Sequence, residues 1–316
     1  MEAVAKKPRS AVSIAGWLGF GFSMLLLFTF LKLPEARLKN LIQGSIASAL
    51  APKGIAFSAK ESGISVGLGI GIRLEGVEIS PPPPQPTVSI ERIDFAPSLF
   101  GLLFSEYGGK FRIRNAGGSL SGKVTYKKKS GTILVDLGAD DFDLGKANFI
   151  GAATGIDLSA LIDGEVYLEG DPAVPSTLAG NVNLTLSQIS MKQQKVAGFP
   201  LPPIQASTGK FQLEIKEAGI KIQELRIGKP QASAPTGGAQ DDLYLNVIGS
   251  ATLAKNWEST ALNLDTKFGF SQAALKPLAL VEALLAPGKQ EDGLYAYAIA
   301  GTAMSPTPTP NKPAGK

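Results

Sequence analysis

The longest apolar stretch of the chain lies near its N-terminus. Residues 10–31 carry no charged side chain, and their large apolar residues include Trp17, Phe20, Phe22, Leu25, Leu26, Leu27, Phe28, Phe30 and Leu31. As a helix, this run would reach about 33 Å, which is enough to cross a hydrocarbon core of about 30 Å. It is longer than the apolar region of a cleaved signal peptide, and no small-residue cleavage site follows closely. We therefore predict a transmembrane anchor at residues 10–33.

The orientation of this anchor follows weakly from its flanking charges. Three basic residues precede the span, and three more follow it within eight residues, so the charge bias is small. A long C-terminal domain tends to translocate largely regardless of its flanks. We therefore expect residues 1–9 in the cytoplasm and a domain of residues 34–304 on the other side of the membrane.

After the anchor, the apolar period is that of an amphipathic helix. Between residues 35 and 50 the apolar positions fall on one stripe, formed by Leu38, Leu41, Ile42, Ile46 and Leu50. Two roles for this helix are open. It can pack on the strands that follow, or it can lie against the membrane surface.

Beyond Pro52 the apolar period changes from 3.6 residues to two. Apolar side chains at even positions from Ile64 to Leu74 alternate with small or polar ones, which predicts one long strand. The glycines of this run lie within the strand and not at a strand-to-helix turn, so a phosphate-binding loop is not expected.

A short phrase of glycine, polar, apolar, any and apolar residues recurs along the body of the chain. Its six copies begin at Gly109, Gly122, Gly164, Gly180, Gly209 and Gly249. We interpret each copy as the start of a strand with its glycine at a turn, and the set as a repeated hairpin unit. The sequence therefore predicts a mainly β domain with a few short helices, which we place at residues 98–104, 158–162 and 273–285.

The repeated phrase also predicts which side chains share a face of the sheet. Alternate residues of a strand point to the same side, so the phrase places one apolar set together: Val124, Tyr126, Val166, Leu168, Val182, Leu184, Phe211 and Leu213. This face is either a packed core or an open groove, and the packed core is favoured. Residues 305–316, rich in Pro, Thr and Lys, are expected to be a disordered tail.

Composition limits the chemistry available to the chain. It has no histidine and no cysteine, which removes Ser-His-Asp triads, thiol nucleophiles, disulfides and the usual zinc ligands. The paired carboxylates at 140–141 and 241–242 lie in turn-like contexts. An enzyme is therefore not expected, and neither is a cofactor or a metal site.

The net charge of +4 comes from the ends of the chain. Residues 40–311 contain 23 basic and 25 acidic residues, so the body is close to neutral. A nucleic-acid-binding domain would concentrate basic residues on its folded part. Nucleic acid is therefore not an expected partner.

The order of these features resembles a known family. An N-terminal span and an amphipathic helix are followed by the phrases at residues 54–57, 74–79, 88–104 and 157–168. This order resembles the AsmA-like envelope proteins and, more narrowly, the GspN proteins of type II secretion systems. The resemblance covers most of residues 10–304, but its motifs are degenerate apolar alternations.

The resemblance implies a single-pass protein of the bacterial inner membrane with a β-rich periplasmic domain and no catalytic residues. For GspN it implies an accessory or assembly component of type II protein secretion, with other secretion-system or envelope proteins as partners. For larger AsmA-like relatives it implies a β-groove that carries lipid. The second hypothesis is therefore a lipid-binding or lipid-transfer module with phospholipid as partner. An open sheet with a bare apolar face favours this second hypothesis, whereas a closed sandwich favours protein contacts.

Overall fold

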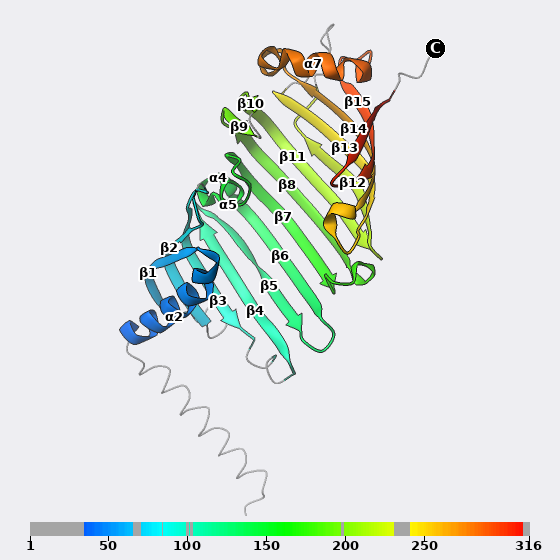
Figure 1. Cartoon of the computed structure of the whole chain (residues 1–316). Coiled ribbons are helices and arrows are strands. Elements are labelled where there is room, and N and C mark those ends of the chain that lie inside the picture. Colours follow the sequence, from blue (N-terminus) through cyan, green and yellow to red (C-terminus); the bar gives the residue numbers. More distant parts are fainter. Residues whose placement is uncertain are drawn as a thin grey trace, which may run out of the picture.

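The computed structural model describes residues 35–65, 71–83, 85–98, 101, 104–196, 199–230 and 241–311. These residues form one antiparallel sheet of fourteen strands, with short helices along its borders (Figure 1). The prediction of a mainly β fold is therefore confirmed. The strands follow one another in chain order across the sheet, and only the small β9–β10 hairpin stands apart from it.

The first eight strands make up the N-terminal part of the sheet. Their bounds are β1 (Ala56–Ser65), β2 (Gly71–Ser80), β3 (Val88–Pro97), β4 (Glu106–Asn115), β5 (Gly118–Lys127), β6 (Thr132–Asp143), β7 (Leu158–Gly170) and β8 (Ala179–Met191). The separate hairpin is β9 (Gln194–Val196) and β10 (Phe199–Leu201). The sheet then continues with β11 (Ile204–Lys216), β12 (Gly219–Ile227), β13 (Leu243–Thr252), β14 (Ala261–Phe270), β15 (Tyr295–Thr302) and β16 (Pro306–Pro310).

The helices lie at the two ends of the sheet and along one border. They are α2 (Glu35–Leu50), α4 (Leu144–Ala147), α5 (Phe149–Thr154), α6 (Gln272–Leu275) and α7 (Ala279–Leu285), with short 3-10 turns η1 (Ala51–Lys53), η2 (Pro175–Thr177), η3 (Trp257–Ser259), η4 (Lys276–Leu278) and η5 (Ala286–Gly288). The amphipathic helix at 35–50 is confirmed as α2, and the helical segment at 273–285 corresponds to α6, η4 and α7. Of the segment 98–104, only Ser98, Gly101 and Phe104 are described.

The predicted helix at residues 158–162 is wrong, because these residues begin strand β7. Leu158 and Ile162 are four residues apart, and that spacing puts two side chains on one side of either a helix or a strand. The helices that belong to this region, α4 and α5, come just before the strand. Asp143 starts α4 by accepting a hydrogen bond from the Lys146 N–H, the usual role of a carboxylate at a helix start.

The predicted single strand from Ile64 to Leu74 is also wrong. Ile64 lies next to the last residue of β1 and pairs with Ile72 of β2, so the two strands form the arms of a hairpin. Both isoleucines occupy even positions, and a hairpin register that joins even to even keeps the same alternation as one straight strand. Hydrophobic alternation alone could not separate the two arrangements.

The six repeated glycines lie within strands. The prediction that each of them stands at a turn, at the start of a strand, is therefore wrong. Gly164 of β7 has φ +129° and Gly249 of β13 has φ +133°, values that a residue with a side chain rarely adopts. A Cβ at Gly164 would come within 2.1 Å of the Asn183 carbonyl oxygen on the neighbouring strand. The glycines therefore permit close backbone approach and bending inside the sheet.

Two clusters of buried side chains lie beneath helices at the borders of the sheet. The first contains Leu74, Val77 and Ile90, and Ile46 of α2 packs against it. Gln43 of α2 also donates a hydrogen bond from Nε2 to the Ala59 carbonyl. The second cluster contains Leu186 and other residues of β7, β8 and β11, with Leu144 of α4 packed on it. Of the two roles left open for the helix at 35–50, the structure shows packing on the first strands.

Aromatic side chains of β14 and β15 pack together near the C-terminal border of the sheet. Phe268 stacks on Tyr295 and Tyr297 with ring centroids 5.6 and 6.1 Å apart, and both tyrosines are buried. The Tyr297 hydroxyl donates to the Leu285 carbonyl at the end of α7, so this helix is tied to the last strands (Figure 1).

The expected disordered tail is wrong for Pro306–Pro310, which form the edge strand β16. Thr307 and Thr309 pair opposite Ala300 and Ala298, and the Asn311 N–H bonds the Ala296 carbonyl in the same alternation. The three prolines therefore occupy positions whose missing N–H groups would point away from β15. Proline is tolerated in an edge strand for this reason. Residues 312–316 lie outside the described part.

The predicted anchor at residues 10–33 also lies outside the described residues. Among the helices from residue 35 onward that the structure describes, none has the length and apolar character needed to cross a membrane.

Candidate functional site: an uncovered apolar sheet face

The strand register brings the predicted apolar residues into rows across the sheet. Val182 of β8 lies opposite Val166 on one side and Leu213 on the other, and Leu184 lies opposite Phe211. Opposed residues of antiparallel strands point to the same face. A further row runs across β5, β6 and β7 through Val124, Val135 and Leu168, and Tyr126 lies opposite Ile133.

We call the surface formed by these rows the apolar face. It extends over β5–β8, β11 and β12 and consists of Val124, Tyr126, Ile133, Val135, Leu137, Val166, Leu168, Val182, Leu184, Leu213, Ile215, Ile220 and Ile222. None of these side chains is buried. Val124 and Tyr126 keep 36% and 41% of their surface exposed, and the others are half-buried. No second layer of described residues covers them.

This arrangement corrects the favoured interpretation of a packed core. The described strands form one large sheet and one two-stranded hairpin, so among them the apolar face has no opposing large sheet against which it can be buried. Only the end of the face nearest α4 is covered. There Leu184 and Phe211 pack against the buried cluster beneath that helix. Six strands spaced about 4.8 Å apart and five residues along each give a footprint on the order of 300 Å². The largest apolar patch on a typical soluble monomer measures about 300–600 Å² and is often functional, so this face is a candidate binding site.

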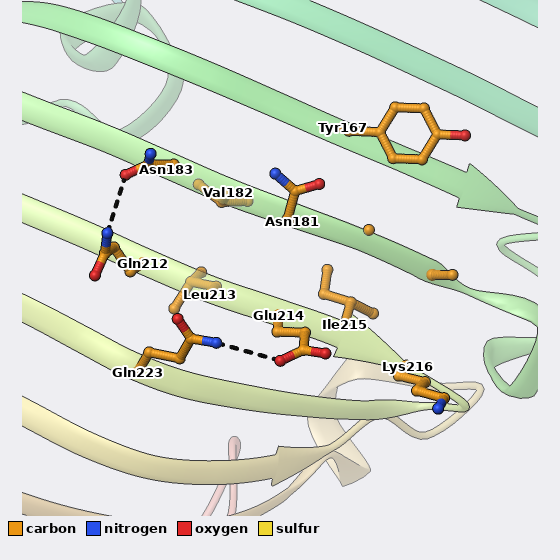
Figure 2. Close-up of a pocket in the computed structure, with 12 residues that line it drawn as sticks. Tyr167, Asn181, Val182, Asn183, Gln212, Leu213, Glu214, Ile215, Lys216 and Gln223 are labelled. Atoms are coloured by element: carbon orange, nitrogen blue, oxygen red, sulfur yellow. Dashed lines mark hydrogen bonds between the residues drawn. The ribbon is translucent and has the colours of Figure 1, made fainter.

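The opposite face of the same strands is polar. Figure 2 shows a shallow hollow on it, with a volume of about 590 Å³, over β7, β8, β11 and β12. Gln212 donates from Nε2 to the Asn183 side-chain oxygen, and Gln223 donates to Glu214. These side-chain hydrogen bonds join β8 to β11 and β11 to β12 on the polar face.

Charged side chains on this polar face form local ion pairs. Lys210 lies 2.8 Å from Glu224, and Arg226 lies 3.1 Å from the same carboxylate. The hydrogen bond from Lys210 lowers the pKa of Glu224 below its ordinary value. At the end of β7, the Tyr167 hydroxyl donates to Glu169, and this bond raises the pKa of Tyr167.

A more buried ion cluster holds the first strands together. Asp94 of β3 is 4% exposed and accepts hydrogen bonds from Ser65, Arg73 and Arg92. Burial raises the pKa of Asp94, but the bonds from Arg92, Arg73 and Ser65 outweigh it and hold the pKa below its ordinary value. The cluster joins β1, β2 and β3, so its role is to fix these strands.

The paired aspartates take part in hydrogen bonds that involve backbone N–H groups. Asp241 accepts bonds from the backbone N–H groups of Ser207 and Lys229, and Asp242 accepts from the Gln205 N–H and the Ser271 hydroxyl. The Asp141 N–H bonds the Asp163 carboxylate at an irregularity of the β6–β7 ladder. Within the described residues, no group of three or more Asp, Glu, His or Cys side chains is arranged to hold a metal.

The sequence analysis missed part of the apolar surface. Phe95 and Tyr107 are 38% and 45% exposed, and Tyr107 lies opposite Tyr126, so both strands contribute an aromatic ring there. Phe95 adjoins this pair, because its ring lies beside Gly109, the residue opposite Val124. Tyr107 stands two residues before the phrase that begins at Gly109, so extending the alternation backwards would have included it.

Comparisons with known proteins leave the identity open. No protein-family model, curated protein or solved structure matches the chain. The resemblance to AsmA-like and GspN proteins therefore stays a prediction from the sequence.

Proposed function

We propose that this protein is a non-catalytic lipid-binding module that holds acyl chains on its apolar face. The observation that supports the proposal is the pair of apolar rows across β5–β8, β11 and β12, over which the described residues place no second layer. Water contact with such a surface is unfavourable by about 25 cal/mol per Å² of apolar area. An acyl chain laid across the strands removes that contact and needs no polar partner.

The cellular setting of the proposal comes from the sequence. Residues 10–33 would anchor the protein in the bacterial inner membrane, with the sheet on the periplasmic side. The role would then be lipid binding or transfer in envelope biogenesis. The alternative, an accessory part of type II secretion, rests on the resemblance to GspN, and adjacent secretion-system genes would support it.

Photocrosslinking within membranes tests the lipid-binding function. Benzoylphenylalanine replaces Val182, which points to the apolar face, or Asn183, which points to the polar face of the same strand. After illumination, mass spectrometry of the full chain is expected to show phospholipid adducts at position 182 and few at position 183. Equal yields of adduct at the two positions, or none at position 182, would contradict the proposal.

A further inference from the structure

Three aromatic side chains that are exposed among the described residues lie near one end of the sheet. Phe104, Tyr107 and Tyr126 are 71%, 45% and 41% exposed. Tyr107 and Tyr126 lie directly opposite each other on β4 and β5, and the Lys128 N–H bonds the Ser105 carbonyl at 3.1 Å. That bond brings the loop after Phe104 against the β5–β6 turn. We call Phe104, Tyr107, Tyr126, Lys128 and Lys129 the aromatic tip.

The charge of the tip comes from its two outer lysines. Lys127 pairs with Glu169 at 3.8 Å, and the Asp171 carboxylate lies beside Gly131. Lys128 and Lys129 are exposed, and no carboxylate among the described residues forms an ion pair with either. Among the described residues, the tip therefore combines two exposed lysines that form no ion pair with three exposed aromatic side chains, while Glu106 lies opposite Lys127 in the β4–β5 register.

This combination matches the headgroup region of a bilayer. Tyrosine rings favour the membrane–water interface because one end is apolar and the other is polar. Lysine side chains near an anionic surface add an attraction of their own. A protein partner would more commonly cover such rings with a fitted pocket, but a lipid surface accommodates rings that come from one loop and two strands.

We propose that the aromatic tip docks on an anionic phospholipid bilayer and so brings the exposed end of the apolar face to the lipid. The inference rests on the proposed lipid-binding function, since it states where acyl chains reach the face. Tyr126 belongs to both the tip and that face, and Val124 is the next residue of β5 on the same face, so a lipid leaving the bilayer meets apolar side chains without crossing water.

An environment-sensitive fluorophore at the tip tests this docking. The chain has no cysteine, so Ser130→Cys supplies the only thiol, and Glu291→Cys at the opposite end of the sheet supplies a matched control. The full chain is placed in phosphatidylcholine nanodiscs, and vesicles of phosphatidylcholine with or without phosphatidylglycerol are added. A second arm places phosphatidylglycerol in the nanodisc itself. We expect the emission at position 130, and not at position 291, to shift to the blue with phosphatidylglycerol in at least one arm.

Variants separate the aromatic and the charged contributions. Lys128→Gln and Lys129→Gln are each expected to raise the vesicle concentration at half-shift by about fivefold. The triple change of Phe104, Tyr107 and Tyr126 to Ser is expected to abolish the shift, while Val174→Ser, an exposed residue at the same end, leaves it unchanged. Circular dichroism checks that each variant keeps its sheet.

Two results would overturn the proposal that the aromatic tip docks on an anionic bilayer. One is an emission at position 130 that no lipid changes, and the other is a shift that survives the triple serine variant. If either occurs while position 182 still crosslinks to phospholipid, the proposed docking of the tip is wrong and the lipid-binding function stands. If crosslinking at position 182 is also absent, both proposals fail.

Discussion

At the scale of single residues, neighbouring positions on one strand have opposite roles. Val182 is half-buried on the apolar face, and Asn183 is exposed on the polar face beside Gln212. Phe211, also on the apolar side, packs against the buried cluster beneath α4. An open face and a packed core therefore make different predictions for the same kind of substitution.

Val182→Asp is expected to leave a folded protein that binds less lipid. The carboxylate at this half-buried position remains in contact with water, so the cost in stability should be about 1 kcal/mol or less. Crosslinking from Leu213, directly opposite, measures the lipid. Asn183→Asp is the control and should change neither property, whereas Phe211→Asp should lower stability by several kcal/mol. Unfolding of the Val182 variant would restore the packed-core interpretation.

Asp94→Asn tests the ion cluster of the first strands. The loss of charge-assisted hydrogen bonds from Arg73 and Arg92 should lower the free energy of unfolding by about 1.5–3 kcal/mol at neutral pH. The pKa of Asp94 is lowered in the folded protein, so this stability is present above the ordinary carboxyl pKa and is lost as the pH falls through the lower folded value.

Denaturant melts from neutral pH into the acid range measure this effect. The difference in stability between the protein and its Asp94→Asn variant should stay constant down to about pH 4 and shrink below it. A difference that shrinks at higher pH would show that the arginines do not hold the carboxylate in its charged form.

At the scale of the elements, bending within strands depends on a few glycines. Gly164→Ala combines an unfavourable positive φ with a Cβ 2.1 Å from the Asn183 carbonyl, and we expect a loss of about 1–3 kcal/mol in stability. Gly138→Ala in β6 is the matched control, since a Cβ there meets nothing within 4 Å. The control should be neutral within about 1 kcal/mol in thermal melts. Equal effects at the two positions would mean that the bend at Gly164 is not required.

Element types were predictable where the apolar period was long and unambiguous. The helix at 35–50 has a 3.6-residue stripe, and the strands of the repeated phrase alternate strictly. Leu158 and Ile162 were misassigned because their spacing fits both periods, and the run from Ile64 was misassigned because a hairpin can preserve the alternation. Local pattern carries no information about where a strand turns back when both arms keep the same parity.

The residues of the apolar face were predictable from the sequence, but the exposure of that face was not. The alternation places Val166, Val182 and Leu213 on one face, as the register does. Whether that face is covered depends on the number of sheets formed by the entire chain, which no single strand encodes. The aromatic tip also depends on the contact between Ser105 and Lys128, two residues from different loops.

At the scale of the whole molecule, the C-terminal edge strand β16 is poorly suited to pairing with a further strand. β16 presents three prolines outward and so lacks the N–H groups that a further strand would need. Pro308→Val restores one such group without disturbing the bonded threonines. We expect stability to change by less than about 0.5 kcal/mol, and self-association to increase. Sedimentation velocity of the full chain in nanodiscs measures the oligomer, and Thr307→Val, on the same strand, is the control. Unchanged sedimentation of the proline variant would show that the edge is protected by another means.

The order of the strands also bears on how the molecule reaches its structure. Nearly every strand pairs with the strand just before it in the chain, and only the step from β8 to β11 passes over a small hairpin. Pairings of low sequence separation close short loops and form quickly for a β protein. Each new strand can add to the existing edge as soon as it becomes available, without waiting for the C-terminus. A chain delivered across a membrane from its N-terminal end could therefore fold progressively, in the order in which it emerges.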